Sequence, residues 1–181
     1  LELVPSGPLS SGNPDPEVFR DGVEPAIGSA DASSQFDTFH NGDQAGDDWF
    51  GIELEGTPNP EMRYAFLSFQ EGLHREEGGW WEDFRVEVRQ GGNWVEAQNL
   101  HVTPPYPFEL AQQPFFDGVG FQTYDIAFDP IAGDAIRLRG TPGGNDGYVS
   151  VAELRVFSVD LLADDGGISD FSKQGTIVGR I

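Results

Sequence analysis

The feature that most constrains the fold of this chain is a run of alternating apolar and charged residues. Between Phe84 and Arg89, every second residue is apolar and the residues between them are charged. This period of two is typical of a β-strand with one face on a core and the other in water. Gly91-Gly92-Asn93 follows, and these residue types accept the positive φ of a tight turn. We therefore expect Trp94 to Ala97 to return as the partner strand of a β-hairpin.

The rest of the chain has the same β character. No apolar stripe with helical spacing persists for three turns, and the 24 Gly and 13 Pro residues indicate many turns. Further strands are expected at residues Phe50 to Leu54, Tyr64 to Gln70, Thr123 to Phe128, Ala135 to Arg139 and Val149 to Phe157. Several strands joined by long loops predict an all-β fold, a jelly-roll β-sandwich.

The length of 181 residues fits one domain with tails. Residues 1–15 are rich in Pro, Ser and Gly and predict a linker or an expression remnant. Residues 16–159 form the expected sandwich. Residues 160–181 read as an acidic linker followed by a strand that could be the first strand of a following module. An apolar strand at a chain end has either docked on the sheet or lost a partner domain.

Charge and cysteine content exclude several function classes. The chain carries 31 acidic and 10 basic residues, for a net charge of -21, and it contains no cysteine. Disulfides, thiol chemistry and cysteine-ligated zinc are therefore excluded. The negative charge disfavours nucleic acid and anionic membranes as partners and favours a neutral ligand or a cation. Adaptation to a salty habitat is an alternative explanation of the same acidity.

Several motifs, in this order, resemble the discoidin-like (coagulation-factor type C) domains and the related galactose-binding-fold carbohydrate-binding modules. The motifs are Arg20-Asp21-Gly22, Phe36 to His40 with Asp47 to Phe50, Phe84 to Trp94, Gly133 to Arg139, and Val151 to Phe157. The resemblance covers roughly Glu17 to Val159. It implies a galactose-binding-like jelly roll and a non-catalytic module that binds carbohydrate.

The run from Phe69 to Trp81 looks like a subgroup found as accessory modules, sometimes in tandem, on large secreted bacterial proteins. This resemblance implies an extracellular location and neighbouring domains as partners. In such arrays a strand like Gly175 to Ile181 begins the next unit, which is the origin of the following-module hypothesis.

The same resemblance implies a structural calcium ion, for which Asp21 and Glu153 occupy the matching positions. Calcium binds six to eight hard oxygens, and the loop from Asp21 to Asp31 is rich in residues that supply them. The alternative is that Asp21 caps a turn and Glu153 is a solvated side chain.

A second group of residues predicts a sugar site. Sugar rings stack on aromatic side chains, while charged and amide groups bond the hydroxyls. The resemblance points to His40, Arg75 and one of the adjacent Trp80 and Trp81, of which an extended backbone turns one inward. The full candidate set is His40, Glu71, His74, Arg75, Trp80, Trp81, Asn145 and Tyr148. For the loop of Asn145 and Tyr148, a plain turn is an equal alternative.

No catalytic motif accompanies these residues. The sequence has no nucleophile elbow, zinc-protease motif or phosphate loop, so we expect no enzyme activity. The leading hypothesis is a carbohydrate-binding module that targets a larger secreted protein to a glycan. The alternative is a protein-binding adhesion module of the same fold that uses aromatic residues at its loop tips.

Overall fold

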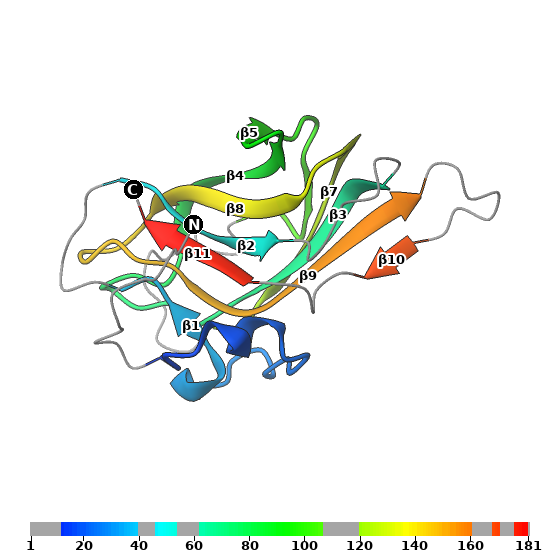
Figure 1. The fold of residues 1–181 in the computed structure, drawn as a ribbon. Coiled ribbons are helices and arrows are strands. Elements are labelled where there is room, and N and C mark those ends of the chain that lie inside the picture. Colours follow the sequence, from blue (N-terminus) through cyan, green and yellow to red (C-terminus); the bar gives the residue numbers. More distant parts are fainter. Residues whose placement is uncertain are drawn as a thin grey trace.

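The computed structural model describes residues 12–39, 46–53, 62–106, 120–160, 168–170 and 176–180. Its strands form two antiparallel sheets that pack face to face as a β-sandwich (Figure 1). The first sheet has the order β1 (Phe36–Asp37), β9 (Ser150–Asp160), β3 (Met62–Glu71), β7 (Thr123–Ile131), β6 (His101–Thr103), and β10 (Ile168–Asp170) also pairs with β9. The second has the order β11 (Thr176–Arg180), β2 (Asp48–Glu53), β8 (Ala135–Pro142), β4 (Trp81–Gln90), β5 (Asn93–Glu96).

This architecture confirms the expected all-β fold. Strands that are distant in sequence lie side by side in both sheets, as in a jelly roll. Each strand expected from the sequence is present, and the predicted hairpin pairs β4 with β5. The short strands β1, β6 and β10 were not anticipated, because two or three residues are too few to carry a period of two.

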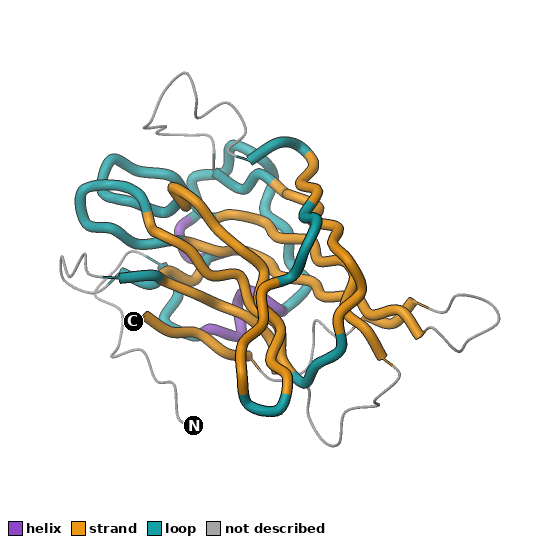
Figure 2. Tube along the Cα trace, turned by 90° about the horizontal axis from the view of Figure 1, so that it is seen from above, coloured by secondary structure: helices purple, strands orange, loops and turns teal. Residues whose placement is uncertain are grey.

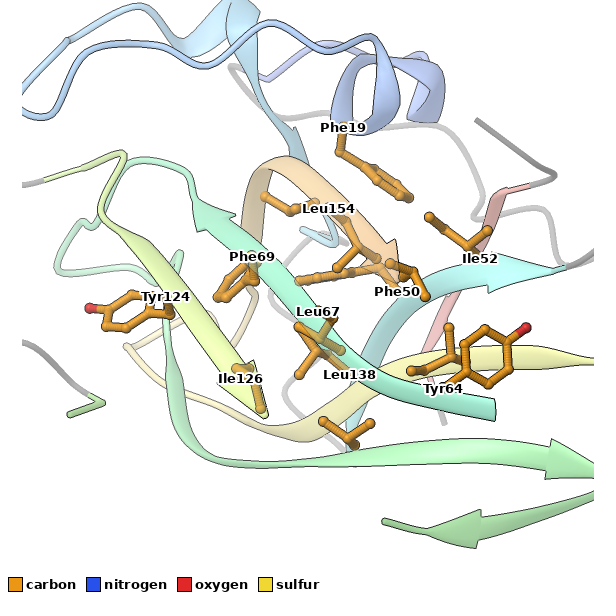
Figure 3. Close-up of a cluster of buried hydrophobic side chains, with 14 of the residues drawn as sticks. Phe19, Phe50, Ile52, Tyr64, Leu67, Phe69, Tyr124, Ile126, Leu138 and Leu154 are labelled. Carbon is orange, nitrogen blue, oxygen red and sulfur yellow. The ribbon is translucent and has the colours of Figure 1, made fainter. Parts of the chain in front are cut away.

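A core rich in aromatic residues holds the two sheets together (Figure 3). Phe50 of β2 is fully buried, and its ring centroid lies 5.5 Å from that of Phe69 on the opposite sheet and 5.6 Å from that of Trp81. Leu67, Ile126 and Leu138 fill the space beside them. Each fully buried side chain of this size contributes about 1.5–3 kcal/mol of burial free energy, so this layer dominates the stability of the sandwich.

Two short 3-10 helices, η1 (Pro16–Arg20) and η2 (Ala32–Ser34), complete the described elements. Phe19 of η1 is fully buried and packs against Phe50, with ring centroids 5.9 Å apart. Asp15 caps this helix, and Asn13 donates a backbone hydrogen bond to Gln35. Residues 12–15 of the expected linker therefore contact the sandwich, whereas residues 1–11 lie outside the described part. No helix among the described residues is long and apolar enough to cross a membrane.

The outer face of the second sheet carries a layer of stacked tryptophans and arginines. The Arg137 guanidinium carbon lies 5.1 Å from the ring centroid of Trp49 and 4.0 Å from that of Trp94, and its Nη2 lies 2.6 Å from Glu87 Oε2. Stacking on two rings and pairing with a carboxylate offset part of the cost of burying this charge, although burial still lowers the pKa of Arg137. Trp49 and Trp94 are thus packing residues. Further ion pairs join Arg85 to Asp47 and Glu87, Arg139 to Asp47, and Arg89 to Glu53 and Asp134.

The strand near the C-terminus belongs to this sandwich. β11 pairs along its length with β2, from Thr176 opposite Ile52 to Arg180 opposite Asp48, and the two run side by side in Figure 1. This pairing is the docked alternative for an apolar strand at a chain end; it differs from the hypothesis that residues 175–181 start a following module, and the sandwich boundary at residue 159 stays a prediction. Without β11, β2 would be an edge strand, and its backbone N–H and C=O groups on that side would have no hydrogen-bond partner in the sheet.

Deleting residues 176–181 is expected to lower the free energy of unfolding by at least about 2 kcal/mol, because β2 would become an exposed edge strand. Urea unfolding followed by tryptophan fluorescence measures this change. Deletion of residues 1–11 is the control and is expected to have little effect. Equal stability of the two truncated proteins would show that β11 is dispensable for the sandwich.

Candidate functional site

Two loops lie side by side at one end of the sandwich, where β3 leads into β4 and β8 leads into β9 (Figure 1). Their backbones are joined by hydrogen bonds from Gly143 N to Trp80 O (2.9 Å), from Asn145 N to Glu76 O (3.0 Å) and from Asp146 N to Glu77 O (2.8 Å). We call residues 74–80 and 143–148 the ledge. Seen from above, loops gather at this end of the strands (Figure 2). The ledge is therefore a fixed surface rather than two independent turns.

Glycines make this close contact possible. Gly79 has φ 102°, and a Cβ there would lie 2.0 Å from the Leu73 carbonyl oxygen. Gly144 has φ 88°, and a Cβ there would lie 2.4 Å from the Glu77 carbonyl oxygen. Both positions require a left-handed backbone and leave no room for a side chain. A side chain at Gly144 would push the two loops apart, and one at Gly79 would displace the Leu73 backbone within the first loop.

Two buried polar residues that the sequence analysis did not single out hold the base of the ledge. The Ser150 hydroxyl lies 3.0 Å from the carbonyl oxygens of both Leu73 and Gly79. Gln35 Oε1 accepts a hydrogen bond from Leu73 N at 2.6 Å. These partners are far apart along the chain, so no local sequence pattern predicts the contacts.

The side chains that the ledge offers to solvent include three of the predicted sugar ligands. Arg75 and Trp80 are partly exposed, and Asn145 is exposed. The Trp80 ring packs against Gly143, where a Cβ would lie 2.3 Å from a ring carbon. Because glycine has no side chain, the indole lies close to the backbone and is held in place. The ledge thus brings a guanidinium, an indole and an amide to one surface.

Tyr148 lies just below this surface and connects it to a third loop. Its ring contacts Phe39 edge to face, with centroids 5.4 Å apart. Burial, and next to it the Asp37 carboxylate, raises the pKa of Tyr148 to about 12, so the hydroxyl stays protonated at neutral pH. The predicted sugar ligand His40 lies outside the described residues. The residue before it, Phe39, is described.

The other three predicted ligands lie in the interior. Glu71 is 0% exposed, His74 is 4% exposed, and the two side chains bond each other at 2.8 Å between Oε2 and Nε2. Trp81 is 1% exposed and belongs to the aromatic core, as expected for one of two adjacent tryptophans. These three side chains therefore lie below the surface that the ledge presents. Trp81 has more exposed neighbours on both sides, as an alternating strand requires, whereas Glu71 and His74 lie in a run, residues 69–74, that is buried throughout.

The two candidate calcium ligands lie near each other at the loop that follows η1. Glu153 is 3% exposed, and its Oε2 accepts a hydrogen bond from Gly22 N at 3.0 Å. Asp21 Oδ1 accepts from Val23 N at 2.7 Å, which is the turn cap considered as an alternative, whereas Glu153 is not the solvated side chain of that alternative. Burial raises the pKa of Glu153 to about 7, and the Asp21 and Glu24 carboxylates add to the shift.

The residues around Glu153 fit a cation only in part. A buried carboxylate beside two others favours bound positive charge. Among the described residues, however, no group of three or more His, Asp or Glu side chains is arranged to hold a metal ion. A calcium ion at Asp21 and Glu153 would therefore depend on backbone carbonyl oxygens for most of its ligands.

The raised pKa of Glu153 predicts a pH-dependent stability in metal-free buffer. Between the ordinary value of 4.5 and about 7, the folded protein holds a proton that the unfolded chain has lost. The free energy of unfolding is therefore expected to fall as pH rises through this range, by up to about 3 kcal/mol. Glu153→Gln is expected to remove this slope in urea unfolding, and the exposed Glu76→Gln to retain it. An unchanged slope in Glu153→Gln would assign the pH dependence to another group.

Comparison with known proteins places the fold. No family model matches the chain, and no curated protein matches it. A solved structure of the Streptococcus pneumoniae β-galactosidase BgaA, described as architecturally intricate and as having multiple functions, is similar to it. The match has a TM-score of 0.55 and 16% sequence identity, and it covers 85% of this chain and 86% of that one. The chain thus has a β-sandwich fold, consistent with a jelly roll, that also occurs in the solved structure of this β-galactosidase.

Proposed function

We propose that this chain is a non-catalytic carbohydrate-binding module that holds an attached protein on a glycan outside the cell. The observation that carries the proposal is the ledge, where Arg75, Trp80 and Asn145, each at least partly exposed, lie on two loops whose backbones are hydrogen-bonded to each other. An indole offers a stacking face for the apolar side of a sugar ring, and guanidinium and amide groups bond hydroxyls with defined direction. His40, which directly follows Phe39 in the sequence, is the fourth proposed contact.

The likeness to a chain of a β-galactosidase supports this proposal, because a module of the same fold occurs there with a protein that acts on a sugar. Since one fold serves many functions, the argument from the ledge residues remains the stronger one. The extracellular location and the neighbouring domains follow from the resemblance to accessory modules of secreted bacterial proteins. Several such modules on one chain would gain avidity from simultaneous binding.

The carboxylates of the ledge support a binding role rather than glycoside cleavage. Glu76 and Glu77 are adjacent and exposed in one loop. Hydrolysis uses two carboxyl groups that face each other across the bond, about 5 to 9 Å apart. Adjacent residues on one turn do not provide this arrangement.

We also propose a structural calcium ion between the loop after η1 and β9. Asp21 and Glu153 would supply carboxylate oxygens, and carbonyl groups of residues 21–31 the remainder. The ion would neutralise the buried Glu153 carboxylate, whose raised pKa reflects the cost of burying its charge. It would tie the first long loop to the sandwich as a disulfide does in proteins that contain cysteine.

A protein-binding adhesion role is the second candidate function. Val23 is 56% exposed and Ile27 is 61% exposed, both on the loop that follows η1. Exposed apolar side chains at a loop tip are typical anchors for a protein partner. A glycan array separates the two functions, since an adhesion module that binds protein would retain no glycan.

Replacing Trp80 or Arg75 by alanine is expected to weaken binding to polysaccharide by more than tenfold, because a central contact contributes on the order of 2 kcal/mol. Affinity electrophoresis on galactan, glucan, xylan and chitin-type polymers measures the loss, and circular dichroism checks the fold. Asn145→Ala is expected to weaken binding as well. Its matched control is Asn93→Ala, an exposed asparagine beyond the far end of β4. Full retention of the Trp80 and Arg75 variants would place the site elsewhere.

Calcium removal is expected to lower the melting temperature, since an ion that binds only the folded state stabilises it by mass action. Differential scanning calorimetry with and without excess chelator measures the shift. In Asp21→Asn and Glu153→Gln the chelator is expected to change nothing further. An unchanged melt of the unaltered protein, with metal content near zero by elemental analysis, would rule out the ion.

A further inference from the structure

The ledge carries one exposed cation among several anions. Arg75 is its partly exposed guanidinium, while Glu76 and Glu77 are exposed and Asp146 is partly exposed. Asp146 N donates to Glu77 O at 2.8 Å, so these two acidic residues lie next to each other across the two loops. Glu76 Oε1 lies 3.4 Å from Asn145 Nδ2, one of the proposed sugar contacts. The acidic groups are therefore part of the same surface as the sugar contacts.

Several charged side chains around the ledge act on the Tyr148 hydroxyl. The carboxylates of Asp37, Glu77 and Asp146 each raise the pKa of the Tyr148 hydroxyl, and the Arg75 guanidinium lowers it, after burial as the largest cause. Three negative charges and one positive charge thus influence a single atom just below the ledge. An anionic group placed there by a ligand would meet a net negative field.

We infer that the ledge selects uncharged glycans and rejects acidic ones, such as uronic-acid or sulfated polymers, and that Glu76, Glu77 and Asp146 determine this selectivity. The inference rests on the proposed function. A lone arginine next to an indole would attract carboxylate and sulfate groups by bidentate pairing. The neighbouring carboxylates offset that attraction, which is selectivity by repulsion of the wrong ligand.

The overall charge of -21 does not produce this selectivity by itself. At about 0.1 M salt, exposed charges are screened beyond about 10 Å, so carboxylates elsewhere on the surface act weakly on a bound sugar. Local acidic groups therefore decide which glycan binds. A change of two charges on the ledge is expected to act differently from the same change elsewhere.

The test compares neutral galactan and glucan with their C6-oxidised, uronate-containing derivatives by affinity electrophoresis and isothermal titration calorimetry. In about 0.1 M salt the unaltered protein is expected to bind a neutral polymer at least about tenfold more tightly than its oxidised form. The double variant Glu76→Gln/Glu77→Gln is expected to reduce this ratio several-fold. About 1 M salt is expected to reduce it as well, since the screening length falls to about 3 Å.

The matched control is Glu96→Gln/Asp129→Asn, which removes the same two charges from exposed positions on β5 and β7. It is expected to keep the selectivity of the unaltered protein. Equal binding of neutral and oxidised polymers, or an equal loss of selectivity in the control, would overturn the inference while leaving the proposed function in place. Absence of binding to every polymer, neutral or oxidised, would overturn the proposed function and this inference with it.

Discussion

The candidate site depends on the contact between the backbones of the two ledge loops. One loop leads from β3 in the first sheet to β4 in the second, and the other leads from β8 in the second sheet to β9 in the first. The relative position of the loops is therefore set by the packing of the sheets around Phe50, Phe69 and Trp81. Gly144 allows the final close approach, because it has no side chain to meet the Glu77 carbonyl oxygen of the other loop. The packing of the core therefore sets where the backbone holds the proposed sugar contacts.

Much of the fold could be predicted from local sequence, because a β-strand with one buried face leaves a period of two. The segment from Phe84 to Arg89 shows this pattern and forms the centre of β4. The same alternation predicts that only one of Trp80 and Trp81 enters the core. Local pattern also identified the turn after β4, where Gly91 and Gly92 both have positive φ.

The features of the fold and of the candidate site that could not be predicted depend on contacts between residues distant in sequence. Glu71 and His74 look like surface ligands by residue type, yet the two side chains bond each other in the interior. Arg137 lies at a solvent-facing position of its strand but is buried between two indoles from other strands. The strand at residues 176–180 carries no local signal that distinguishes docking on β2 from membership of another module. Such pairings become visible only when the sheet order is known.

The central claim is that a glycan binds on the ledge. The most direct measurement is a two-dimensional NMR titration of the isotopically labelled chain with a neutral oligosaccharide that the full protein retains. The account predicts that amide shifts change at residues 75–80 and 143–148, together with the Trp80 indole, while the outer face of the second sheet around Trp94 stays unchanged. Shift changes centred on that outer face, or on the loop of Val23 and Ile27, would contradict the account.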